Sequence, residues 1–442
     1  MSDLQKAFDT IIKKQSLVKT AWNYYNGDQP LKYSTERLKE AFDRMNTRFV
    51  QNWCALVVDS VLERLQLSGV DVDNKDDNEE IDMLWSRYHI DVEAMEVHRT
   101  VEVTSEAYVI IWKEEDTVDF YVNDPEMCHA FYKADKPKVK EYAAKMWQDG
   151  DEWHMTLYYP DRFEYYTAKS KDVPSSANSF KMDEDSPKDN PYKVIPVFHF
   201  KAQSDLKNIL TMQDAINKLF ADMMVASEYG SFPQRYIINN GNVSALKNGA
   251  NIIWNVPGSD GEGQDTEVGQ FEAAPLAGYL EAMGSITNNI AIISRTPKHY
   301  FMNSGANISG DALIAMEAPL VKKVQSIQKV LKPVWQEAMS FMMLLEGKQI
   351  DPVDINLVWE PILSVQPLAE AQAMKLNFEM GVPIVTIMRW MGKTTAEIQQ
   401  LLDDMKKQKA IESSVAQAVL NSIRDTTAQE NTQENDADTS QS

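Results

Sequence analysis

The residue types that most often carry catalysis occur here without the spacing that catalysis needs. Neither cysteine, Cys54 nor Cys128, has CxxC spacing, so we expect two buried thiols rather than a metal knuckle or a disulfide framework. Paired carboxylates such as Asp403 and Asp404 face different directions on a helix, and 66 acidic residues make chance pairs unavoidable. We therefore predict no catalytic residue, no cofactor-binding residue and no metal site. The histidines, which show no HExxH or other ligand spacing, are His89, His98, His129, His154, His199 and His299.

Two glycine-containing segments could suggest phosphate binding, but neither has the required pattern. Gly258–Asp265 is acidic, lacks lysine and opens no helix whose amides could hold an anion. Gly392–Thr395 lacks the earlier glycine of a Walker motif, because Ile387 stands at that position. Gly392 instead follows a predicted helix end, and Thr394 with Glu397 forms a capping box that opens the next helix.

The acidic stretch 71–80 also fails as a calcium loop, since it has no glycine at loop position six and Lys75 interrupts the ligand pattern. We interpret it as a solvated loop. It separates a helix that carries Phe49, Trp53 and Leu65 on one face from a second helix over 80–105.

Composition indicates a globular protein of more than one domain, since 442 residues with 43% hydrophobic content can form separate cores. We find no secretion signal and no apolar run long enough to span a membrane. The formal charge of −22 argues against a tight duplex binder, which needs a basic face. A conduit through which DNA slides would benefit from few phosphate contacts, but an acidic protein is also simply soluble, so charge permits both interpretations.

A loop followed by a very long helix dominates the chain. Residues 295–310 show no period, and Pro297 disfavours helical geometry before it. Apolar residues then recur at three- and four-residue steps from Leu313 to Phe341, which predicts a helix over 311–345 of about 50 Å, capped by Ser309. Each proline inside a helix removes one amide and crowds a carbonyl, so we expect bends at Pro319 and Pro333.

Two further helices are predicted before that loop. The first begins after Ser204 and runs to 230. The second, 276–294, has few charges, and we expect its apolar face to be buried against neighbouring subunits, with burial inside one domain as the alternative. The segment between them contains two β-like runs, 235–238 and 251–256. The predicted interface residues are Tyr279, Leu280, Met283, Ile286 and Ile290.

The remaining segments give a mixed pattern. Residues 4–25 read as a helix, and alternating aromatic and β-branched runs between 107 and 200 predict an antiparallel sheet region. We expect a mobile surface loop over 168–192, a short strand at 355–361, and helices over 367–380, up to 391 and over 395–422. Residues 425–442 have no apolar face and are expected to be disordered.

This order of segments resembles the portal proteins of long-tailed bacteriophages over most of residues 20–400. The resemblance is carried by Tyr24–Gly27, Asn190–Phe200, Ser204 with Gln213–Asn217, and the loop with its proline-containing helix. It implies an α+β, portal-like fold with a mixed helix and sheet wing, two stem helices, a β-containing clip, a long kinked helix and a helical crown. The implied divisions are wing 1–203, first stem helix 204–230, clip 231–272, second stem helix 273–295, channel loop 296–309, kinked helix and strand 310–362, crown 363–424 and polar tail 425–442.

The resemblance also implies a function. Such proteins form a ring, usually of twelve subunits, at one capsid vertex of the virion, and double-stranded DNA passes through it without sequence specificity. The expected partners are the terminase large subunit, the major capsid protein, a head-tail adaptor and any scaffolding protein, with assembly in the host cytoplasm and no membrane. The alternatives are a capsid adaptor or scaffold without a channel, and a metal-dependent nuclease that uses scattered Asp and Glu.

In the resembling family the loop before the kinked helix projects into the channel. An ordinary surface connection, with Tyr300 and Phe301 packed onto the nearest core, is the alternative. The residues that the resemblance places toward DNA are Lys298, His299, Tyr300, Phe301, Asn303, Ser304, Gly305 and Asn307.

Overall fold

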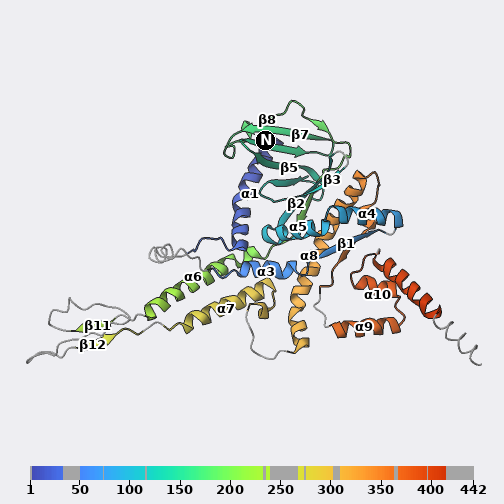
Figure 1. Cartoon of the computed structure of the whole chain (residues 1–442). Coiled ribbons are helices and arrows are strands. Elements are labelled where there is room, and N and C mark those ends of the chain that lie inside the picture. Colours follow the sequence, from blue (N-terminus) through green and yellow to red (C-terminus); the bar gives the residue numbers. More distant parts are fainter. Residues whose placement is uncertain are drawn as a thin grey trace, which may run out of the picture. The chain divides into compact units, whose positions relative to one another are not determined.

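The computed structural model describes residues 2–32, 50–72, 74–114, 117–231, 235–238, 267–272, 275–301, 309–362, 367–395 and 397–414. Helices and antiparallel sheets alternate along the chain (Figure 1), which confirms the predicted α+β class. The chain divides into two compact units. The first comprises residues 1–66 and 88–352, and the second comprises residues 67–87 and 353–442.

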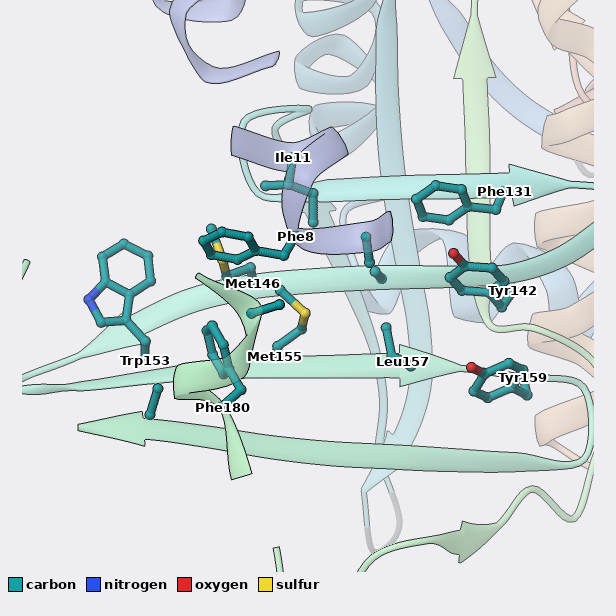
Figure 2. Close-up of a cluster of buried hydrophobic side chains, with 14 residues drawn as sticks. Phe8, Ile11, Phe131, Tyr142, Met146, Trp153, Met155, Leu157, Tyr159 and Phe180 are labelled. Atoms are coloured by element: carbon teal, nitrogen blue, oxygen red, sulfur yellow. The ribbon is translucent and has the colours of Figure 1, made fainter. Parts of the chain in front are cut away.

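The first unit begins with helix α1 (Asp3–Asn26), as predicted, packed on a six-stranded antiparallel sheet. Phe8 and Ile11 of α1 belong to the same buried cluster as Met146, Met155 and other side chains of the sheet (Figure 2). The helix therefore covers the sheet with its apolar face. The strands are β4 (Cys128–Tyr132), β5 (Lys140–Asp149), β6 (Glu152–Tyr158), β7 (Arg162–Lys169), β8 (Lys181–Met182) and β9 (Lys188–Asp189), which also pairs with β7.

A second, three-stranded sheet has the order β10-β2-β3, with β2 (Glu106–Glu114), β3 (Thr117–Asn123) and β10 (Val197–Lys201). A buried cluster that includes Tyr108, Cys128 and Val197 joins it to the larger sheet. The predicted strands between 107 and 200 are thus confirmed. Both cysteines are buried and free, as expected.

The segment 168–192, predicted to be a mobile surface loop, is partly ordered on the core. This region contains the short helix η1 (Ala177–Ser179) and the strands β8 and β9. Ala177 and Phe180 are buried in the cluster between α1 and the large sheet. Two apolar residues in a polar segment are enough to hold it on the core, although they form no period that a sequence pattern would detect.

The other helices described in the first unit are α3 (Trp53–Leu62), α5 (Ile90–Thr104), α6 (Leu206–Ser231), α7 (Ala277–Ser294) and the long α8 (Gly310–Leu345). The long helix packs against β10 and β2. The helices α6 and α7 pack side by side (Figure 1), and β11 (Arg235–Ile238) pairs with β12 (Glu267–Gln270) in the sequence between them. The predicted run 251–256 lies outside the described residues. Ser309 Oγ accepts the amide of Ala312 at 3.3 Å, which confirms the predicted cap of α8.

The second unit pairs β1 (Leu67–Val72) with β13 (Ile355–Trp359) and contains α4 (Lys75–Arg87), α9 (Pro367–Glu379), α10 (Ile384–Trp390) and helical residues 397–414. The short helix η3 (Pro352–Asp354) precedes β13. Thr394 Oγ1 accepts the amide of Glu397 at 3.3 Å, and Glu397 Oε2 accepts that of Thr394 at 3.0 Å. The predicted capping box is therefore confirmed, whereas 425–442 lies outside the described residues.

The prediction of a solvated loop over 71–80 is wrong, because Asp71 pairs with Asn356 in the sheet and α4 begins at Lys75. Asn74 Oδ1 accepts the amide of Asp76 at 3.0 Å and so caps α4. Acidic side chains in a first turn suit the positive end of a helix dipole. The charge run that suggested a loop is a helix start.

Trp335 of α8 is buried in the middle of the first unit and fixes α8 to α5. Its Nε1 donates to His98 Nε2 at 3.1 Å, and His98 Nδ1 donates to the Leu65 carbonyl at 2.9 Å. Burial lowers the pKa of His98 to about 4, because a charged imidazole would lose its hydration. The neutral ring accepts one hydrogen bond and donates the other.

This contact predicts a loss of stability in mild acid. Between pH 6.5 and about 4 the unfolded chain binds a proton at His98 that the folded chain does not, so stability falls by about 1.4 kcal/mol per pH unit as the pH decreases. In His98→Gln the amide can still accept and donate. Denaturant unfolding at pH 6.5 and 5.0 should show a loss smaller by about 2 kcal/mol in the variant. Equal losses would contradict the assignment.

Candidate functional site between α7 and α8

The segment between α7 and α8 starts with a sharp helix end. Arg295 adopts a left-handed conformation, with φ of 56°, and the amide of Thr296 donates to the Ala291 carbonyl at 3.1 Å. The buried hydroxyl of Ser294 donates to the Ile290 carbonyl at 2.7 Å. The chain then turns at Pro297 into the short helix η2 (Lys298–Tyr300). The exit from α7 is thus held by its own backbone.

Phe301 fastens the end of η2 to the core. Its ring meets that of Trp53 edge to face at a centroid distance of 5.3 Å, and it is buried in a cluster with side chains from α1, α3, α6 and α7. Aromatic side chains bury a large apolar area, so this contact contributes strongly to the position of the segment.

Tyr300 connects the same turn to α8, because its hydroxyl is hydrogen-bonded to both members of the buried ion pair between Arg64 and Glu317. Its hydroxyl donates to Glu317 Oε1 at 3.1 Å and accepts a hydrogen bond from Arg64 Nη2. Arg64 Nη2 also lies 3.3 Å from Glu317 Oε2, and only 9% of Arg64 is exposed. We call Arg64, Tyr300 and Glu317 the Arg64 cluster. Such charge-assisted bonds are stronger than neutral ones.

The Arg64 cluster joins the two sides of segment 302–308. Tyr300 precedes the segment, and Glu317 follows it, two residues before Pro319. His299 Nε2 also lies 3.9 Å from Glu317 Oε1. The first turns of α8 are therefore held to η2 rather than only to the rest of α8.

A second contact holds α8 just after Pro319. The buried ammonium of Lys323 pairs with Asp205 and donates to the Ser294 carbonyl at 3.2 Å. Burial raises the pKa of the nearby Glu102 to about 7. The positive charge of Lys323 lowers this pKa, and the negative charge of Asp205 raises it. Pro319 thus lies between two points of attachment, one to η2 and one to the end of α7.

Three polar residues of α6 explain the Gln213–Asn217 motif. Gln213 Oε1 accepts the amide of Trp53 at 2.9 Å, and Asn217 Oδ1 accepts that of Gln51 at 3.1 Å. Asp214 accepts a hydrogen bond from Tyr24 at 2.7 Å. All three side chains are buried, so the motif fixes α6 to the end of α1 and the start of α3.

The structure describes four of the eight residues predicted to line the channel. Lys298 is exposed, His299 and Tyr300 are partly buried, and Phe301 is buried in the core, as the alternative interpretation expected for the two aromatic residues. Phe301 therefore serves as an anchor within this chain. The other four predicted residues, Asn303, Ser304, Gly305 and Asn307, lie outside the described residues, so their role stays a prediction.

The predicted interface residues of α7 also differ in burial within the single chain. Ile290 is buried in the cluster with α3 and α6, Met283 is also buried, and Ile286 is partly buried. Leu280 is 58% exposed, while Tyr279 is intermediate. Part of this face is thus used inside the chain, and Leu280 stays available. Pro319 and Pro333 both lie within α8, and bends at them stay a prediction.

Sequence reasoning missed Arg64, Glu317 and Lys323. Arg64 and Tyr300 are 236 residues apart, and no local pattern relates them. One signal was present, because Glu317 lies four residues after Leu313 and three before Leu320, on the apolar stripe of α8. A carboxylate on such a stripe indicates a buried cationic partner.

Metal-ligating side chains and apolar helices were compared across the described residues. Among them, no three or more His, Cys, Asp or Glu side chains gather in a way that could hold a metal ion. None of the helices described combines the length and the hydropathy of a membrane span.

Comparison with known proteins gives a consistent result. A family model described as "Phage portal protein, SPP1 Gp6-like" matches residues 9–413. The portal protein of Mycobacterium phage D29 is 23% identical over 381 residues, which cover 78% of this chain and 76% of the relative. The portal protein of Mycobacterium phage L5 is 23% identical over 396 residues, which cover 80% of this chain and 78% of the relative. A chain in the solved structure of the neck of an empty gene transfer agent (GTA) particle aligns with a TM-score of 0.48 at 11% identity. The alignment covers 85% of this chain and 93% of the chain in that structure.

The Arg64 cluster predicts a measurable cost for loss of one charge. Glu317→Gln keeps the shape of the side chain but leaves the exposed carboxylate of Glu63, at 3.6 Å, as the anionic partner of the buried Arg64 among the described residues. Denaturant unfolding should show a loss of about 2 to 3 kcal/mol. The matched control Glu152→Gln breaks an exposed pair with Lys169 and should change stability by less than about 0.5 kcal/mol. Equal effects would refute the role of Glu317.

Proposed function

Because the family model matches residues 9–413, the chain belongs to the SPP1 Gp6-like phage portal proteins, and we propose that its ring conducts double-stranded DNA at one capsid vertex. The family match is the observation that carries this proposal. It confirms the resemblance found in the sequence. Portal proteins are structural components of the virion, so it also confirms the prediction that this chain is not an enzyme.

The ring is a homo-oligomer, and twelve subunits is the number we propose. A head-to-tail contact closes into a ring when the rotation between neighbours divides a full turn. Exposed apolar side chains on α7, among them Leu280 and Ile292, support burial against another copy.

The segment that contains Lys298 faces the DNA in this proposal. Lys298 is exposed, while Tyr300 and Phe301 behind it are held by α3 and α8, so the backbone is fixed where the side chain is free. One cation per subunit supplies transient phosphate contacts without a strong grip. The net charge of −22 agrees with a conduit that lets DNA slide.

We also propose the division of the chain into wing, stem, clip and crown, and the proposed partners are assigned on that division. The clip, with its β11–β12 pair, would receive the terminase large subunit during packaging and the head-tail adaptor afterwards. The wing would contact the major capsid protein and any scaffolding protein. Assembly would take place in the host cytoplasm, with the finished ring in the virion.

Two other functions have less support. An adaptor or scaffold without a channel would not need the long α8 preceded by an anchored segment. A metal-dependent nuclease needs clustered carboxylates, and the described part of the chain shows no such cluster of three or more ligands.

Electron microscopy of the purified full chain tests the proposal directly. We expect a closed ring, with twelve subunits by native mass spectrometry and a central channel wide enough for a duplex. A closed ring whose centre is blocked would favour the adaptor. A chain that stays monomeric at high concentration, without rings in the images, would reject the portal proposal.

A further inference from the structure

A groove of about 750 Å³ lies between the start of α6, the end of α7 and the middle of α8. Lys323, which attaches α8 to Asp205 and to the end of α7, lines this groove. Its lining includes the basic side chains Lys201, Lys207, Arg295 and Lys323 and the apolar side chains Ile293 and Val330.

Apolar side chains line part of this groove and are open to water in the single chain. Ile293 is 42% exposed and Val330 is 51% exposed, while Ile327, which also lines the groove, is buried. Ile292, next in sequence to Ile293, is 66% exposed. Isoleucine and valine at this exposure, gathered on two adjoining helices, indicate a surface that another molecule covers.

Cations surround the apolar part. Lys201, Lys207 and Arg295 are all exposed, and among the described residues none of them makes an ion pair. Lys323 and Asp205 neutralise each other. In a chain with 44 basic and 66 acidic residues, unpaired basic side chains collected at one groove give it a charge opposite to that of the protein as a whole.

We propose that this groove receives the neighbouring copy of the chain in the ring, which presents an acidic and partly apolar surface. The inference rests on the proposed function, since a ring gives every subunit a neighbour. Charge complementarity supports a second copy, because each copy carries −22 overall. Water exclusion by the apolar side chains would strengthen contacts to the cations.

DNA would also be attracted by the cations, but it fits the groove less well. Phosphates gain nothing from Ile293 and Val330, and the carboxylate of Asp205 lines the same groove. A protein surface with acidic and apolar side chains matches both features. The neighbour would then contact α7 and α8 next to Lys323, so each subunit would support the attachment of α8 in the next one.

Photo-crosslinking identifies the occupant. A benzoylphenylalanine placed at Val330 of the full chain should give covalent dimers on denaturing gels once rings have formed. The same group at Val173, another exposed apolar position, is the matched control and should give at least about fivefold fewer. Crosslinks from Val330 to DNA in filled particles, or no enrichment of dimers over Val173, would overturn the proposal.

Substitutions test the energetic role. Ile293→Asp with Val330→Asp should leave the unfolding midpoint of the chain close to wild type but abolish rings at concentrations where wild type is fully assembled. Lys207→Glu with Arg295→Asn, which suits the left-handed backbone, should raise the half-assembly concentration at least about fivefold. The control Lys171→Glu with Val173→Asp should assemble normally.

The outcomes separate this inference from the proposed function. If wild type forms no ring, the proposed function fails. If wild type and both groove variants form rings equally well, the portal proposal stands and the groove proposal is wrong. If the aspartate variant does not fold, the cation variant decides, because its side chains are exposed and contribute little to the monomer.

Discussion

The burial of Tyr300 and Phe301 is the constraint on which the arrangement around α8 depends. Phe301 occupies the cluster formed by α1, α3, α5, α6 and α7, while the Tyr300 hydroxyl meets Arg64 and Glu317. One turn of chain therefore fixes the end of α7 and the first turns of α8 together.

This constraint also determines how α8 is held around Pro319. A proline in a helix leaves one carbonyl without its partner, so the helix is weakest there. The structure holds α8 on both sides of that point, by Glu317 before it and by Lys323 after it. A bend at Pro319 would therefore change the distance between these two attachments of α8. In a DNA-conducting ring, the segment between α7 and α8 is the part of each subunit proposed to lie next to the duplex.

Local patterns predicted most of the elements, because period and capping are encoded by neighbours in sequence. The apolar steps from Leu313 to Phe341 and the Thr394–Glu397 capping box are examples. Sequence failed where composition misled, as in the acidic start of α4. It also failed where a contact joins distant residues, since the side chain of Gln213 is held by the amide of Trp53 and the carbonyl of Gln51, and no local pattern relates these residues. The candidate site was proposed from the family resemblance, which does not distinguish the residues that anchor the segment from those that are exposed.

The central claim is that Lys298 faces DNA while Phe301 anchors the segment behind it, and crosslinking in filled particles tests this most directly. A photoreactive amino acid at position 298 should form covalent adducts with the packaged DNA, because that side chain is exposed. The same group at the exposed position 173, far from the segment in sequence, should not. Adducts at 298 and none at 173 are the predicted result. Filled particles without adducts at 298 would contradict the account.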